Sequence, residues 1–133
     1  MQERLNAITH GVGAMLALVG LAVLTFAAAI HGTVWHVVSF AVFGAGLVLL
    51  YGVSAVYHSL PRGAAKSAFQ RLDHAAIFLL IAASYTPFTL VVLHGAFGWA
   101  AFGVIWGLAV LGILCESMFG HRLEVLELSL IHI

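Results

Sequence analysis

Apolar residues run along this chain in four long segments, without the alternation of a half-buried strand or the polar face of a soluble helix. Each segment is about 19 residues or longer, which is the helix length that crosses a hydrocarbon core of roughly 30 Å. A shorter apolar run, 125–133, is too short to cross. The pattern predicts an all-α, polytopic transmembrane bundle with four full spans and the start of a fifth, forming a single membrane domain, 1–133. The four predicted spans are 7–30, 34–57, 75–93 and 97–115.

Composition supports lipid as the solvent of these helices. Hydrophobic residues make up 63% of the chain and charged residues 8%, with a mean hydropathy of +1.13. A soluble bundle needs a polar outer face on each helix, and so few charged residues cannot cover four helices. The net charge is zero with histidine counted as neutral, so there is no basic surface for nucleic acid. The expected partner is membrane lipid.

The basic residues predict the orientation of the helices. Two tight links, 31–33 and 94–96, alternate with two longer predicted connections, 59–74 and 116–124. All five basic residues lie on the side of the N-terminus and the longer connections: Arg4, Arg62, Lys66, Arg71 and Arg122. Because short loops rich in Lys and Arg favour the cytoplasmic side, we expect the N-terminus to be cytoplasmic. A cleaved secretory signal is the alternative for the first span, but that span is too long and three more follow it.

Proline and glycine add two expectations about packing. Pro87 lies inside the third span, where it removes a backbone hydrogen bond, so we expect a bend there. Gly103 and Gly107 have the G-x-x-x-G spacing of close helix contacts. Packing within one protomer is favoured over a dedicated dimer seam as the explanation of this spacing, and the oligomeric state stays open.

Polar side chains gather at one end of the predicted spans. An ionisable group near hydrocarbon is costly, so its position suggests a function. Glu3, Asn6 and His10 begin the first span, and a second set with the same i, i+3, i+7 spacing ends the second span. This spacing places each set on one helical face. Asp73 opens the third span at a similar depth, so three helices bring polar groups to one level. The second set is Tyr51, Ser54 and His58.

Each of these residues also has a purely structural interpretation. His58 could be a neutral interfacial histidine, Asp73 an N-cap of the third helix, and Ser54 a hydroxyl bonded to its own helix. Asn6 and His10 could serve only to dock the first span. Their convergence favours function, because a histidine, a carboxylate and a hydroxyl at one depth are the components of a metal-hydroxide site.

The motifs resemble those of the bacterial hemolysin III family, within the superfamily of progestin and adiponectin receptors. The resemblance covers most of the chain and rests on four motifs in order: E-R-L-N-A-I-T-H at 3–10, Y-G-V-S-A-V-Y-H at 51–58, D-H at 73–74 and S-Y-T-P-F at 84–88. It implies a seven-helix protein of the bacterial cell (inner) membrane, with a cytoplasmic N-terminus and a zinc site near the inner leaflet.

The resemblance also implies residue roles and an activity. His58 would be a zinc ligand, Ser54 would lie beside the metal, and Asp73 would hold or activate the attacking water. Two further histidine ligands would come from an H-x-x-x-H motif in a last span, before which this sequence stops. The implied activity is zinc-dependent hydrolysis of membrane lipid amides or esters, and we expect this chain alone not to hold zinc tightly. The alternative is a non-enzymatic protein: a sensor of bilayer state, or the pore-forming cytolysin of the family name, although the spans lack a continuous polar stripe.

The expected orientation can be tested by cysteine labelling. In a Cys115→Ser background, a membrane-impermeant maleimide applied outside intact cells should label a cysteine at Gly32 or Gly95 and miss one at Gly63. If only the Gly63→Cys variant is labelled, the orientation is the reverse of the one predicted.

Overall fold

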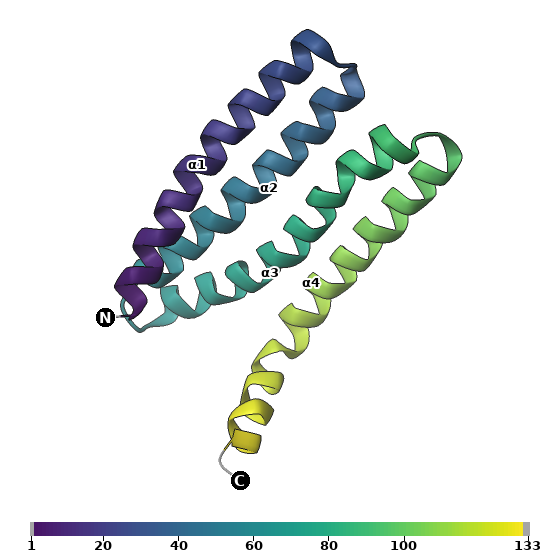
Figure 1. Cartoon of the computed structure of the whole chain (residues 1–133). Coiled ribbons are helices and arrows are strands. Elements are labelled where there is room, and N and C mark those ends of the chain that lie inside the picture. Colours follow the sequence, from purple (N-terminus) through teal and green to yellow (C-terminus); the bar gives the residue numbers. More distant parts are fainter. Residues whose placement is uncertain (1, 132–133) are drawn as a thin grey trace.

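The computed structural model describes the backbone of residues 2–131 and the side chains of residues 2–118. Figure 1 shows long helices lying side by side in chain order. Each runs antiparallel to the one before it, so the N-terminus and the α2–α3 connection lie at the same end. The elements are α1 (Gln2–His31), α2 (Val34–Ser59), α3 (Ala64–Pro87), the π-helix η1 (Phe88–Leu93) and α4 (Gly95–Ile131).

Among the described residues, four helices are long and apolar enough to span a membrane, which confirms the predicted fold class. The predicted spans 7–30 and 34–57 lie inside α1 and α2. The third predicted span covers the second part of α3 together with η1. The fourth lies in the apolar part of α4, Gly95–Met118.

The connection between α2 and α3 is much shorter than the predicted one at 59–74. Only residues 60–63 separate the two helices, and α3 already begins at Ala64. The first turns of α3 are rich in Ala, Lys, Gln and Arg, which are good helix formers but not apolar. A hydropathy window detects the part of a helix that crosses lipid and misses such polar turns. Asp73 is therefore inside α3, and its interpretation as an N-cap is wrong.

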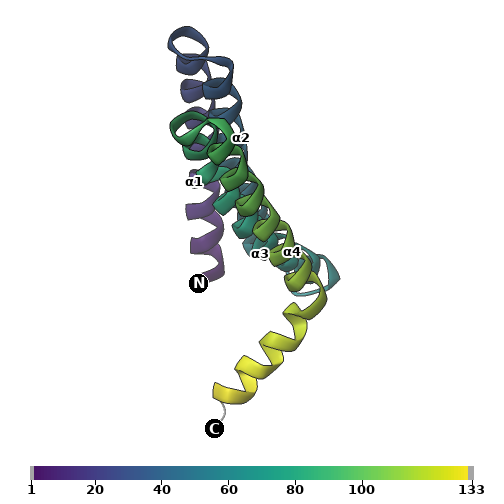
Figure 2. The same cartoon turned by 90° about the vertical axis from the view of Figure 1, so that its right-hand side faces the viewer.

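The predicted connection 116–124 is also helical, because α4 continues without a break to Ile131. Figure 2 shows the yellow C-terminal part of α4 at an angle to the green part that packs on α3. The predicted start of a fifth span at Val125 belongs to this same helix. Its crossing of a membrane stays a prediction, and residues 132–133 lie outside the described part.

The link between α1 and α2 is stabilised by His36, a histidine in the first turn of α2. The backbone N–H of Thr33 donates to Nδ1 of His36 over 3.2 Å. The Thr33 hydroxyl lies 2.9 Å from the same nitrogen. These contacts satisfy polar groups at the start of α2, where the first backbone N–H groups of a helix have no partner within it. His36 thus stabilises the tight turn at 32–33.

The predicted disturbance at Pro87 appears as a change of helix type. Pro87 ends α3 and has no N–H to donate, and the π-helix η1 follows directly. The Thr86 hydroxyl donates to the carbonyl of Ala82 over 2.9 Å. It also accepts a hydrogen bond from Nε1 of Trp106 on α4 over 3.2 Å. The irregular turn is therefore tied to its neighbouring helix by a buried side chain.

Glycines allow the helices to approach closely. A Cβ atom at Gly46 of α2 would lie 2.8 Å from Cβ of Ala83 on α3. A Cβ atom at Gly112 of α4 would lie 2.5 Å from the Phe78 ring of α3. Small residues at such contacts let backbones pack where no hydrophobic effect drives helices together.

We expect Gly46→Leu to destabilise the bundle, because the larger side chain must push α3 away. Overpacking of this kind typically costs about 1 to 3 kcal/mol. Gly52→Leu is the matched control on the same helix, since nothing among the described residues lies within 4 Å of a Cβ atom there. Denaturant unfolding in bicelles measures both. Equal stabilities of the two variants would contradict the packing described here.

Candidate functional site

Two polar side chains join α1 to α2 near the end that holds the N-terminus. The hydroxyl of Ser54 lies 2.7 Å from Nδ1 of His10. Ser54 is only 4% exposed, so this contact is nearly closed to solvent. Its hydroxyl is therefore engaged by the neighbouring helix, and the interpretation that Ser54 bonds only to its own helix is not what the structure has.

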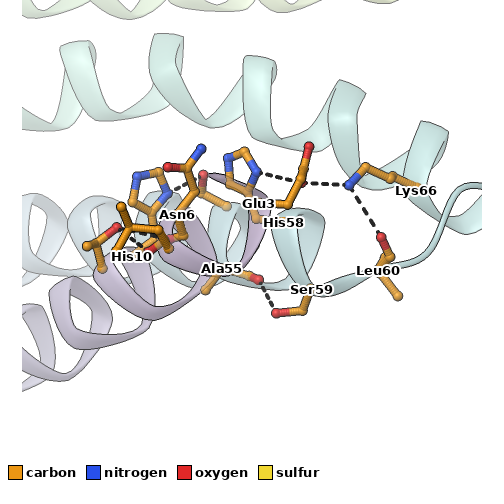
Figure 3. A network of polar contacts seen from close by, with 11 residues as sticks. Glu3, Asn6, His10, Ala55, His58, Ser59, Leu60 and Lys66 are labelled. Atoms are coloured by element: carbon orange, nitrogen blue, oxygen red, sulfur yellow. Dashed lines mark hydrogen bonds and ion pairs between the residues drawn. The ribbon is translucent and has the colours of Figure 1, made fainter. Parts of the chain in front are cut away.

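A second group joins three helices one turn further toward the helix ends. One carboxylate oxygen of Glu3, Oε2, lies 3.1 Å from Nδ1 of His58 and 2.8 Å from Nζ of Lys66. Figure 3 shows these two contacts as consecutive dashed lines from α2 through Glu3 to α3. The side chains of His58 and Lys66 are 15% and 16% exposed, whereas that of Glu3 is 58% exposed. Both donors are thus held in the protein while the carboxylate is partly open to water.

The rings of the two histidines connect these groups. His10 and His58 have ring centroids 5.4 Å apart in an edge-on arrangement. The Tyr51 ring lies 5.9 Å from that of His10, and the Tyr57 ring lies 4.7 Å from that of His58. We call the connected set the polar cluster; it consists of Glu3, His10, Ser54, His58 and Lys66.

The polar cluster brings together two of the three predicted site residues, Ser54 and His58. It also contains three residues to which the sequence assigns no catalytic role: Glu3, His10 and Lys66. Glu3 and His10 share the predicted face of α1, so the i, i+3, i+7 spacing already indicates their position. Lys66 is not found this way, because its helix begins inside the predicted loop.

Asp73, the third predicted site residue, lies on α3 and is half-buried. Among residues 2–118, no hydrogen bond or ion pair connects it to Ser54 or His58. Seven residues separate Asp73 from Lys66, so helical periodicity places the two on one face of α3, about 10 Å apart along the axis. Lys66 reaches Glu3 from that face, and Asp73 therefore lies on the side of α3 that faces the polar cluster.

A further polar contact, absent from the sequence-based predictions, joins α3 to α4. Nδ1 of His74 lies 2.8 Å from Oε1 of Glu116. The pair lies on the same side of the bundle as the polar cluster, since α3 begins and the apolar part of α4 ends there. The sequence carries one signal for this pair, since His74 and Glu116 lie at the ends of two consecutive predicted spans, but the predicted connection 116–124 places Glu116 in a loop.

The donor chemistry of His58 fits a zinc ligand, but the described residues do not make a complete site. Catalytic zinc normally uses three protein ligands. Among residues 2–118, no group of three or more His, Cys, Asp or Glu side chains is arranged to hold a metal ion. A zinc site that includes His58 would need ligands from beyond these residues.

Comparison with known proteins gives the family. Residues 1–130 match the sequence model of the family described as haemolysin-III related. This chain belongs to that family. It is a multi-pass membrane protein, as the four apolar helices and the family together show. No solved structure matches it.

Two curated members of the family are close in sequence. Hemolysin-3 of Bacillus cereus is 45% identical over 121 residues, which are 91% of this chain and 55% of that protein. The Hemolysin-3 homolog of Bacillus subtilis (strain 168) is 40% identical over 126 residues, which are 95% of this chain and 59% of that protein. The chain thus spans somewhat more than half the length of these relatives.

Proposed function

We propose that this chain forms part of a zinc-dependent membrane hydrolase that acts on lipid amides or esters. The observation that carries the proposal is the contact of His58 Nδ1 with the Glu3 carboxylate. Metal-ligating histidines almost always donate their other ring N–H to a carboxylate, a carbonyl or water, which fixes the ring and its tautomer. His58 is held in this way, on a helix end where the sequence resemblance expects a ligand.

Zinc, when bound, would supply Lewis acidity toward the substrate carbonyl and toward water. The residues of this chain would supply the other polar groups of the site. Ser54 is kept in place by His10 over 2.7 Å and presents a hydroxyl near His58, one helical turn away. Asp73 offers a half-buried carboxylate as proton acceptor, on the face of α3 that also carries Lys66.

The membrane position favours a lipid substrate. The polar cluster lies at one end of helices whose outer surfaces are apolar along most of their length. A lipid amide or ester has its carbonyl groups near the boundary between headgroups and hydrocarbon, which is the depth of a site at helix ends. A water-soluble substrate would gain nothing from this placement.

The second candidate function is non-enzymatic, and the name of the Bacillus cereus relative, Hemolysin-3, favours it. Under this alternative the protein would be a cytolysin or a sensor of bilayer state. The polar cluster would then serve only to hold α1, α2 and α3 together. Lipid hydrolysis and cell lysis, the activities that distinguish the two candidates, can be measured on the same purified protein.

We expect an extended protein to carry one zinc per chain: residues 1–130 joined to the C-terminal remainder of Bacillus cereus Hemolysin-3. His58→Ala should remove the zinc and lower hydrolysis of a fluorescent lipid amide by more than about 100-fold, because even loss of an orienting partner typically costs 10- to 100-fold. His31→Ala, which removes an exposed histidine from the opposite end, should leave both unchanged. Metal content by mass spectrometry and product formation in nanodiscs provide the readouts.

The unextended 133-residue chain is the second control, and it should retain far less than one zinc per chain after dialysis against a mild chelator. A full zinc load on this chain would mean that the ligand set lies within it. An extended protein that is metal-free but lyses red blood cells would replace the hydrolase by the second candidate.

A further inference from the structure

Glu3 lies between two hydrogen-bond donors from two different helices. Its Oε2 atom faces Nδ1 of His58 at 3.1 Å and Nζ of Lys66 at 2.8 Å. The backbones of α1 and α3 are not direct neighbours in the described part of the chain. The long Lys66 side chain therefore reaches past α2 to meet the carboxylate, and Figure 3 shows Glu3 between the two nitrogens.

This contact determines which nitrogen of His58 carries the proton. An ionised carboxylate only accepts hydrogen bonds, so Nδ1 of His58 must be the donor. In a neutral imidazole one nitrogen carries a proton and the other has a free lone pair. Nε2 of His58 is then the unprotonated nitrogen, and its free lone pair can bind a metal ion.

Lys66 keeps the Glu3 carboxylate in the position where it accepts the hydrogen bond from His58. Glu3 is more than half exposed, and without a second partner its side chain would be free to turn into water. The Lys66 ammonium is itself fixed by three groups: the Glu3 carboxylate, the Leu60 carbonyl at 3.3 Å and the Tyr57 ring, whose centroid is 4.8 Å away. The first turn of α3 thereby holds a side chain at the start of α1.

We propose that Glu3 and Lys66 are positioning residues that hold His58 in the Nδ1–H tautomer, with Nε2 available to a zinc ion. The assignment rests on the proposed function for the identity of the ion, but the tautomer itself does not depend on it. It gives α1 and the first turn of α3 a role in the site, although neither supplies a predicted zinc ligand. Neither residue needs to touch the substrate.

The tautomer can be read directly by 15N NMR of the whole chain in nanodiscs, labelled at histidine. Spectra are recorded at about pH 9, well above the pH at which free imidazole titrates, and the signal that disappears in His58→Gln identifies His58. We expect a single Nδ1–H tautomer in the wild-type chain. Glu3→Ala should give a mixture in which the Nδ1–H population falls at least about twofold, since no carboxylate then selects it.

Matched lysine and arginine variants separate positioning from charge. Lys66→Met should also lower the Nδ1–H population, and Lys66→Arg should restore it, because a guanidinium can donate to the same carboxylate. Arg62→Met removes the same charge from the neighbouring α2–α3 connection and should leave the tautomer unchanged. An unchanged tautomer in Glu3→Ala, or an equal change in Arg62→Met and Lys66→Met, would overturn the proposal. Helix content by circular dichroism verifies that each variant is folded.

The same variants in the extended protein separate this inference from the proposed function. Glu3→Ala should raise the zinc dissociation constant about 10- to 100-fold, the usual effect of losing an orienting partner. If the tautomer shifts while the extended protein holds no zinc, the proposed function fails and the positioning role stands. If zinc is bound equally well with and without Glu3, the positioning role fails and the hydrolase proposal stands.

Discussion

The structure depends on one constraint: a polar group near hydrocarbon must find a partner inside the protein. Without water to bond to, each unsatisfied donor or acceptor costs several kcal/mol. The constraint is visible at Thr86, which bonds within its own helix and accepts from Trp106. It is visible again at His10 and Ser54, which bond across two helices. Within the described residues, the Ser39 hydroxyl is the exception, because it is buried and has no partner.

The same constraint explains how the family's motifs become one site. Polar residues that begin α1 meet polar residues that end α2, since the two helices are antiparallel and joined by a tight link, and Glu3 also meets Lys66 of α3. The two imidazoles of the polar cluster are thus each held through Nδ1, one by a hydroxyl and one by a carboxylate. A site built on helix ends in this way is held by packed helices rather than by flexible loops.

Much of the fold follows from the sequence, because apolar length alone identifies helices that cross lipid. The ends of α3 and α4 do not follow, since their polar turns lie outside the hydrocarbon and leave no hydropathy signal. The candidate site is likewise predicted only in part from the sequence. The i, i+3, i+7 spacing correctly places Ser54 and His58 on one face, but it cannot say that Glu3 meets His58 or that His74 meets Glu116. Those pairings depend on how each helix is rotated against its neighbour, which a single sequence does not encode in its spacing.

The polar groups of α1 and α2 are bonded to each other. A double-mutant cycle on His10→Ala and Ser54→Ala measures the strength of this bond. Unfolding free energies of the wild type, both single variants and the double variant are determined in bicelles. We expect a coupling energy of about 0.6 kcal/mol, the average for hydrogen bonds between membrane helices, and at most about 1.7 kcal/mol. A control cycle of His10→Ala with Ser59→Ala, whose hydroxyl bonds to Ala55 of its own helix, should be additive within about 0.5 kcal/mol. If the effects of His10→Ala and Ser54→Ala on the unfolding free energy are also additive, the two side chains are not bonded to each other.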